Sequence, residues 1–140
     1  MRLSCVSSLI IFLLTNICGN QIALILVLNL ELAQNADLIV HESTNAYLEG
    51  IDVGSNMYLV NKDARMHGHS TPQIAGEFAK RVYAKKLILN HFSSRYKGDE
   101  SLESIAIMTR IEKQAIEASG LGEDSVAAAW DFMTVPIATN

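Results

Sequence analysis

The pattern of hydrophobic and polar positions divides the chain into two unlike parts. Residues 3–30 contain no charged side chain, whereas the sequence from Glu31 onward mixes apolar, polar and charged positions as a globular domain does. In this second part, short apolar runs alternate with stretches in which apolar residues recur every three or four positions. The alternation predicts an α/β domain over residues 31–140.

Two of the apolar runs have the length of buried strands. Leu38–Val40 ends at His41, and Leu87–Leu89 ends at Asn90 and His91. Both runs consist of aliphatic residues, which favours strands that are buried in a sheet. Because an amphipathic stretch lies between them, they predict a strand–helix–strand unit.

Two amphipathic helices are predicted, over residues 72–84 and roughly over residues 101–118. The first begins at Thr71 and Pro72, where a hydroxyl can cap the helix and proline occupies a position that needs no amide hydrogen. Apolar side chains then recur on one face of each helix. Glycines at positions 120 and 122 predict the end of the second helix.

Two further stretches have weaker patterns. Residues 43–68 are polar and irregular, and they predict a long loop with one helical turn. Loops of that length in a compact domain are usually functional or mobile. Near the other end, Val126–Ala129 and Phe132–Ile137 predict terminal strands, or one strand that is interrupted at residues 130–131.

The uncharged segment, residues 1–30, has three interpretations. It resembles a secretory signal, and residues 3–30 are also long enough to span a bilayer, for which about 20 apolar residues suffice. A polar break at Asn16–Gln21 weakens the membrane interpretation, and the third possibility is sequence foreign to the domain. Both cysteines lie in this segment, so the domain from Glu31 onward has no cysteine framework.

All four histidines lie between positions 41 and 91, at junctions of the predicted elements. A histidine that closes a strand can reach the ligand-binding edge of an α/β sheet, so His91 is a candidate metal ligand. His69 precedes a helix N-terminus, where it suits a phosphate contact or protonation of a leaving oxygen. His41 and Glu42 pair an imidazole with a carboxylate that can orient it. Solvated side chains are the structural alternative in each case.

A basic run near His91 is a candidate nucleic-acid contact in a chain of net charge −4. Its six positive charges are Lys80, Arg81, Lys85, Lys86, Arg95 and Lys97, with no acidic residue among them. Such a stripe is consistent with binding to a phosphate backbone, and a solvated helix face is the alternative. Arg95 and Lys97 are the better candidates because they lie beside the histidine.

Three motifs in this order carry a family resemblance. Ala36–Leu48 contains His-Glu-Ser-Thr, His67–Gly76 contains His-Ser-Thr, and Ala84–Tyr96 contains Asn-His-Phe-Ser-Ser-Arg. They resemble the His-Glu-Ala-Thr segment, the His-Ser-Thr segment and the last metal-binding motif of the tRNase Z (ribonuclease Z) family. That family trims the 3′ ends of precursor tRNAs, and the likeness is strongest to its short form. It covers about residues 31–137.

The resemblance implies a fold, a cofactor and residue roles. It implies the C-terminal half of a metallo-β-lactamase-type αβ/βα sandwich, in a hydrolase that uses two zinc ions on precursor tRNA. His91 is then a metal ligand, His69 holds or protonates the scissile phosphate, and Glu42 and His41 belong to the catalytic group. The residues expected to bind substrate are Ser93, Arg95 and Lys97. The family also implies a homodimer and a location in the cytoplasm or nucleus.

The chain departs from the family pattern in ways that bear on activity. It lacks the H-x-H-x-D-H motif, the later single-histidine ligand and the Gly-Asp-Thr motif, which would lie shortly upstream of Glu31. Because a two-metal mechanism needs both ions held, we expect a fragment that is inactive alone, with a truncated gene model as its simplest source. The alternative is a membrane-anchored, catalytically dead binding module, with residues 1–30 as its anchor or as a secretory signal.

Overall fold

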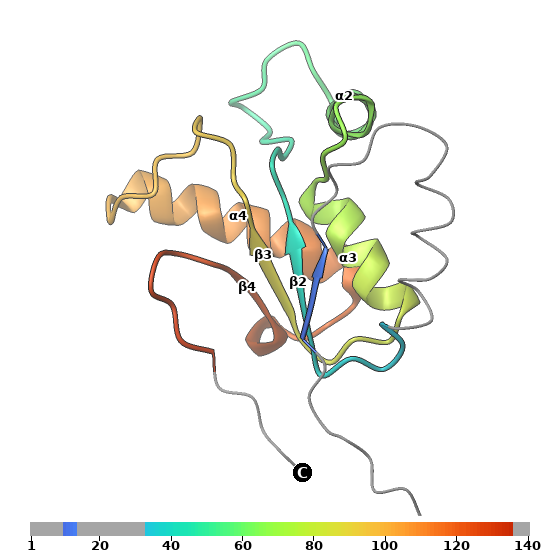
Figure 1. Ribbon diagram of the computed structural model, residues 1–140. Coiled ribbons are helices and arrows are strands. Elements are labelled where there is room, and N and C mark those ends of the chain that lie inside the picture. Colours follow the sequence, from blue (N-terminus) through green and yellow to red (C-terminus); the bar gives the residue numbers. More distant parts are fainter. Residues whose placement is uncertain (1–9, 14–32, 136–140) are drawn as a thin grey trace, which may run out of the picture.

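The computed structural model describes residues 10–13 and 33–135 of the chain, which form strands and helices in alternation (Figure 1). In chain order the elements are β1 (Ile10–Leu13), β2 (Leu38–Glu42), α2 (Met57–Met66), α3 (Pro72–Arg81), β3 (Leu87–Asn90), α4 (Leu102–Ser119), the 3₁₀ helix η1 (Glu123–Ser125) and β4 (Val126–Ala128). The α/β class expected from the sequence is therefore confirmed.

The strands form one parallel sheet in the order β1-β2-β3-β4. In its central pair, Ile39 lies opposite Leu87 and Glu42 lies opposite Asn90. Parallel neighbours need a crossover connection, and α3 provides the one between β2 and β3. The carboxyl ends of β2 and β3 consequently meet at the same edge of the sheet, which is where the predicted motifs lie.

The hydrophobic core lies between the sheet and the pair of helices α3 and α4. Alternate strand residues face these helices because side chains alternate across a strand. Buried strand and helix members of this core are Ile39, Leu87, Leu89, Val126, Ala75, Ala79, Ile111 and Ala115. Burying such side chains stabilises the fold by roughly 25 cal/mol for each Å² of apolar surface removed from water. The core thereby fixes the two strand ends that carry the motifs.

Helices α3 and α4 cross at short range because Gly76 has no side chain. A Cβ atom at that position would lie 2.6 Å from the carbonyl oxygen of Ala115 and 2.8 Å from the Cβ atom of Ala118. These distances are shorter than van der Waals contact. The small residue therefore sets the distance between the two helices.

Both predicted helices are present, with the expected caps. The Thr71 hydroxyl accepts a hydrogen bond from the amide of Ile74, and Pro72 occupies the first turn of α3. Helix α3 ends at Arg81, three residues earlier than predicted. Gly120 closes α4 in the left-handed conformation, with φ of 72°. A residue without Cβ adopts that conformation at no steric cost.

Two parts of the structure differ from the predicted elements. Residues 57–66 form a ten-residue helix, α2, where the sequence predicted a loop with one turn. Only Ala64 of α2 is buried, so this helix packs little on the core, and it begins at the Asn56 cap. At the other end, the strand Val126–Ala128 forms, whereas residues 132–135 of the predicted strand Phe132–Ile137 are irregular and its last two residues lie outside the described residues.

Most of the uncharged segment 1–30 lies outside the described residues, so its three interpretations stay predictions. Its residues 10–13 form β1 and pair with β2 in the sheet. Within residues 10–13 and 33–135, no helix combines the length and apolar character needed to cross a membrane.

Candidate metal centre

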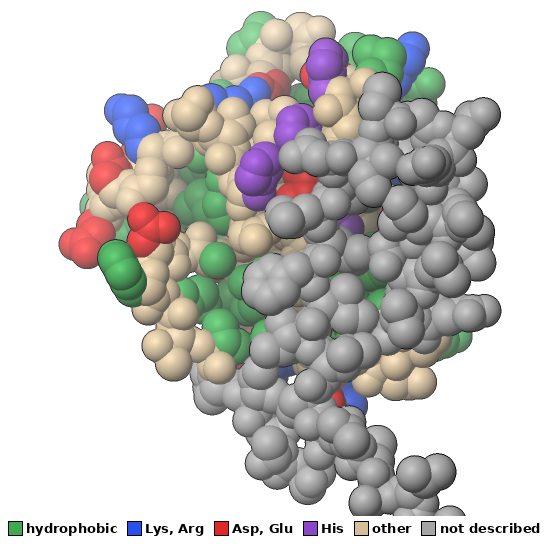
Figure 2. Space-filling view, viewed as in Figure 1, with side chains coloured by type: hydrophobic (Ala, Val, Ile, Leu, Met, Phe, Trp, Pro, Cys, Tyr) green, Lys and Arg blue, Asp and Glu red, His purple; other side chains and the backbone are tan. Residues whose placement is uncertain are grey.

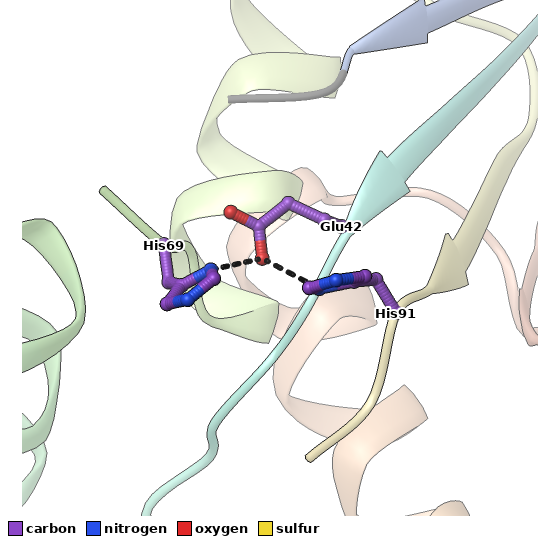
Figure 3. A group of neighbouring side chains, drawn as sticks. All are labelled: Glu42, His69 and His91. Carbon is purple, nitrogen blue, oxygen red and sulfur yellow. Dashed lines mark ion pairs between the residues drawn. The ribbon is translucent and has the colours of Figure 1, made fainter. Parts of the chain in front are cut away.

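Three residues from the predicted motifs converge at the carboxyl edge of the sheet. They are Glu42, His69 and His91, and each offers a ligand atom within 4.8 Å of the others. Figure 3 shows the carboxylate of Glu42 between the two imidazoles, with its Oε2 atom 3.7 Å from Nδ1 of His69 and 3.9 Å from Nδ1 of His91. The sequence placed all three at strand or helix ends, and the structure brings them together.

The environment of the three side chains is graded from buried to exposed. The Glu42 side chain is 3% exposed, that of His69 is 29% exposed, and that of His91 is 51% exposed. Purple histidine side chains accordingly gather on the face seen in Figure 2, beside a red acidic side chain. A buried carboxylate beneath two accessible imidazoles can orient them toward a ligand that arrives from solvent.

The backbone holds Glu42 and His91 in register beyond the ends of their strands. The amide of Ser43 donates to the carbonyl of Asn90 at 2.8 Å, and the amide of Ser93 donates to the carbonyl of Thr44 at 2.9 Å. His91 lies between these two bonds, in the left-handed conformation with φ of 56°. The left-handed conformation costs free energy in a residue that has a Cβ atom, and strained backbone of this kind is common at functional sites.

His69 is fixed from the other side of the site. Its amide donates to the carbonyl of Ala64 at 2.8 Å, which ties it to the end of α2. Two residues later Thr71 begins α3, and the Thr71 hydroxyl also donates to Asn61 of α2 at 2.6 Å. The turn between the two helices therefore aims His69 at the sheet edge.

Thr44 is the residue of this site that sequence analysis did not single out. Its hydroxyl lies 2.5 Å from Oε2 of Glu42, 2.9 Å from Nδ1 of His91 and 3.3 Å from Nδ1 of His69. One hydroxyl thus contacts all three members of the group. Thr44 is the last residue of the His-Glu-Ser-Thr motif, and that membership was the sequence signal that could have identified it.

His41 does not join the group. Strand alternation places its side chain on the opposite face from Glu42, where its ring lies 5.6 Å from that of Phe78 in α3. Burial lowers the pKa of His41, while a hydrogen bond from Nδ1 to the carbonyl of Glu42, at 2.8 Å, opposes that shift. A neutral, buried imidazole packed on a helix suits a structural position, and the catalytic role predicted for His41 stays untested.

The three residues expected to bind substrate have different surroundings. The guanidinium of Arg95 donates to Asp52 at 2.9 Å and to the carbonyl of Ala46 at 3.0 Å. Ser93 contributes its amide to the bond with Thr44 already described, and Lys97 is exposed. Arg95 therefore fastens the segment that follows Thr44, and its predicted contact with substrate would have to share the guanidinium with Asp52.

The basic run is split between the two ends of β3. Four of the charges precede that strand: Lys80, Arg81, Lys85 and Lys86. The other two, Arg95 and Lys97, follow it, a few residues after His91. Lys85 forms an ion pair with Asp37, which precedes β2. Because β2 and β3 are parallel, these four charges lie at the opposite edge of the sheet from His91. The structure thus does not bring the six charges together as one stripe.

The strained backbone at His91 leads to a stability prediction. We expect His91→Gly to be more stable than His91→Ala by about 1 kcal/mol, because glycine removes the cost of the left-handed conformation. Both variants lose the imidazole, so their difference isolates the backbone term. Urea unfolding followed by circular dichroism measures it. Equal midpoints for the two variants would show that position 91 is not strained.

The three donors fit zinc by their chemistry. Imidazole nitrogen and carboxylate oxygen are both zinc ligands in proteins, so each of the three residues could contribute to a zinc site, and the roles proposed below assign His91 to the metal. Ligands of a tetrahedral zinc ion lie roughly 3.4 Å apart, so a limit of 4.8 Å requires only small side-chain adjustments. His91, the most exposed of the three, can be reached by further ligands from another part of a protein.

Comparison with known proteins agrees with these features. No protein-family model matches the chain. The human zinc phosphodiesterase ELAC protein 1 is 38% identical over 112 residues, which are 76% of this chain and 26% of that protein. Ribonuclease Z of Bacillus velezensis is 38% identical over 107 residues, which are 76% of this chain and 28% of that protein. The crystal structure of human tRNase Z, short form, superposes with a TM-score of 0.49 and 32% identity, covering 79% of this chain and 28% of that one.

The human relative is named as a zinc phosphodiesterase, and the bacterial relative is named as a ribonuclease Z. The chain belongs to the ribonuclease Z family, and it spans about a quarter of the length of the curated relatives it matches.

Proposed function

We propose that this chain supplies part of the active site of a zinc-dependent endoribonuclease that removes 3′ trailers from precursor tRNAs. The observation that carries the proposal is the convergence of Glu42, His69 and His91 in a chain related to ribonuclease Z. The described α/β layer would be one half of a metallo-β-lactamase-type sandwich. Further zinc ligands would come from the complementary part of such an enzyme.

Each residue of the group has a distinct proposed role. His91 would hold zinc, because its imidazole is the most accessible of the three. Zinc held there would supply activation of the hydrolytic nucleophile at neutral pH. Glu42 would orient the two imidazoles from its buried position.

His69 would act on the phosphate rather than on the metal. It lies two residues before the N-terminal cap of α3, where the helix dipole and free amides favour an anion. Its imidazole is part-exposed and hydrogen-bonded to Thr44, so it can contact a phosphate oxygen or protonate the leaving oxygen. A transferred proton would therefore come from a ring whose orientation is already fixed.

A chimera tests this function directly. Residues 31–140 would replace the matching C-terminal part of an intact short-form tRNase Z, which supplies the other zinc ligands. We expect the chimera to release the 3′ trailer from a precursor tRNA in the presence of zinc, whereas the 140-residue chain alone leaves the substrate intact. The measurement is gel separation of labelled RNA, with the parent enzyme as positive control. A folded, zinc-loaded chimera that does not cleave the substrate would refute the proposal. Specific cleavage by the isolated 140-residue chain would also refute it, because the site would then need no zinc ligands from another part of an enzyme.

A further inference from the structure

The hydroxyl of Thr44 lies between Glu42, His69 and His91, the three residues of the candidate metal centre. The number of hydrogen bonds that this hydroxyl can donate and accept determines which ring nitrogens of the two histidines carry a proton. A threonine hydroxyl has one hydrogen to donate and two lone pairs that accept. It contacts three atoms: Oε2 of Glu42 and Nδ1 of the two histidines. Each of the three contacts must therefore use a different one of these capacities.

The single hydroxyl hydrogen belongs to the contact with Glu42. An ionised carboxylate only accepts hydrogen bonds, and the 2.5 Å separation requires a proton between the two oxygens. The backbone amide of Thr44 approaches the same Oε2 atom at 3.3 Å, as a second donor to a carboxylate would. Thr44 consequently has only lone pairs left for His69 and His91.

Both histidines must then donate from Nδ1. The separations from the Thr44 hydroxyl are 2.9 Å for His91 and 3.3 Å for His69. Direct hydrogen bonds from Nδ1 to Oε2 of Glu42 are excluded by distance, because the separation is 3.9 Å for His91 and 3.7 Å for His69. A neutral imidazole that carries its proton on Nδ1 has its free lone pair on Nε2. The carboxylate thus acts on the two rings through Thr44.

We propose that Thr44 is a positioning residue that holds His69 and His91 in the Nδ1–H tautomer and leaves Nε2 of each ring to face the ligand. The Nε2 lone pair of His91 would suit zinc, whereas Nε2 of His69 would have to take up a proton before it could contact a phosphate oxygen; both contacts rest on the function proposed above. The tautomers themselves follow from the contacts of Thr44 alone. Glu42 is then the buried acceptor that orders Thr44.

Nuclear magnetic resonance of the full-length, metal-free chain tests the assignment. With isotope-labelled histidine rings at a pH where the imidazoles are neutral, the nitrogen chemical shifts distinguish a protonated ring nitrogen from an unprotonated one. We expect protonated Nδ1 and unprotonated Nε2 for His69 and His91 in the wild-type chain. Thr44→Ser keeps the hydroxyl and should keep both tautomers. Thr44→Val keeps the shape, removes the hydroxyl and should shift both rings toward the Nε2–H form.

His41 is an internal control for the fold in the same spectra. Its Nδ1 atom contacts the carbonyl oxygen of Glu42, which only accepts, so the ring is held as Nδ1–H without Thr44. Its signals should stay unchanged in Thr44→Val when the sheet is intact.

Two results would overturn the proposal. One is a wild-type or Thr44→Ser chain in which His91 carries its proton on Nε2. This measurement can be made even if Thr44→Val does not fold. The other is a folded Thr44→Val chain in which both tautomers are unchanged. Neither measurement involves zinc, RNA or turnover, so failure here is separate from failure of the proposed nuclease function.

Discussion

His69→Ala in the active chimera should lower turnover by about 10²–10⁴-fold and leave zinc bound, which is the usual range for a positioned acid or phosphate contact. The reason is its position: His69 lies two residues before the N-terminal cap of α3, where the helix dipole and free amides favour an anion. Single-turnover cleavage of precursor tRNA gives the rate, and metal analysis of the purified protein gives the zinc content.

His91→Ala is the matched variant, because it removes the other imidazole that Thr44 contacts. It should lose zinc as well as activity, since it removes a proposed metal ligand. The opposite pattern, in which His69→Ala strips the zinc and His91→Ala retains it, would reverse the two roles and refute the assignment made here.

Gly76→Ala should destabilise the chain strongly, by about 1–3 kcal/mol, as overpacking in a rigid contact does. The added methyl would meet the Ala115 carbonyl at 2.6 Å, and this backbone atom cannot turn away as a flexible side chain could. The gain in helix propensity on replacing glycine, up to about 1 kcal/mol, offsets only part of that cost. Helices α3 and α4 would have to separate.

Chemical unfolding of Gly76→Ala measures this cost, and Gly98→Ala is the control. A Cβ atom at Gly98 meets no atom within 4 Å, so that variant should unfold close to the wild-type midpoint. A midpoint for Gly76→Ala equal to that of Gly98→Ala would show that the helices are not in the close contact described.

Elements with a strong local pattern could be predicted from the sequence, and elements defined by distant contacts could not. Strands β2 and β3 and helix α3 appeared at their predicted places because apolar periodicity and the Thr71-Pro72 start are local properties. Helix α2 did not, because it buries only Ala64 and depends on its Asn56 cap.

The candidate site divides in the same way. Glu42, His69 and His91 could be selected because each lies in a motif at the end of an element. The role of Thr44 depends on three contacts, two of them with residues 25 and 47 positions away, and no local pattern encodes such contacts. The commitment of Arg95 to Asp52, 43 positions away, was hidden for the same reason.

The two backbone bonds that continue the β2–β3 pairing past the strand ends have a consequence for motion. They attach the loop ends that carry Thr44 and His91 to the two central strands of the sheet. Central strands open only with the whole domain, whereas loop ends usually fluctuate at little cost. The backbone that carries His91 is therefore expected to open together with the central strands rather than to fluctuate as a surface loop does. The site is ready for its ligand before the ligand arrives, and binding need spend little free energy on ordering it.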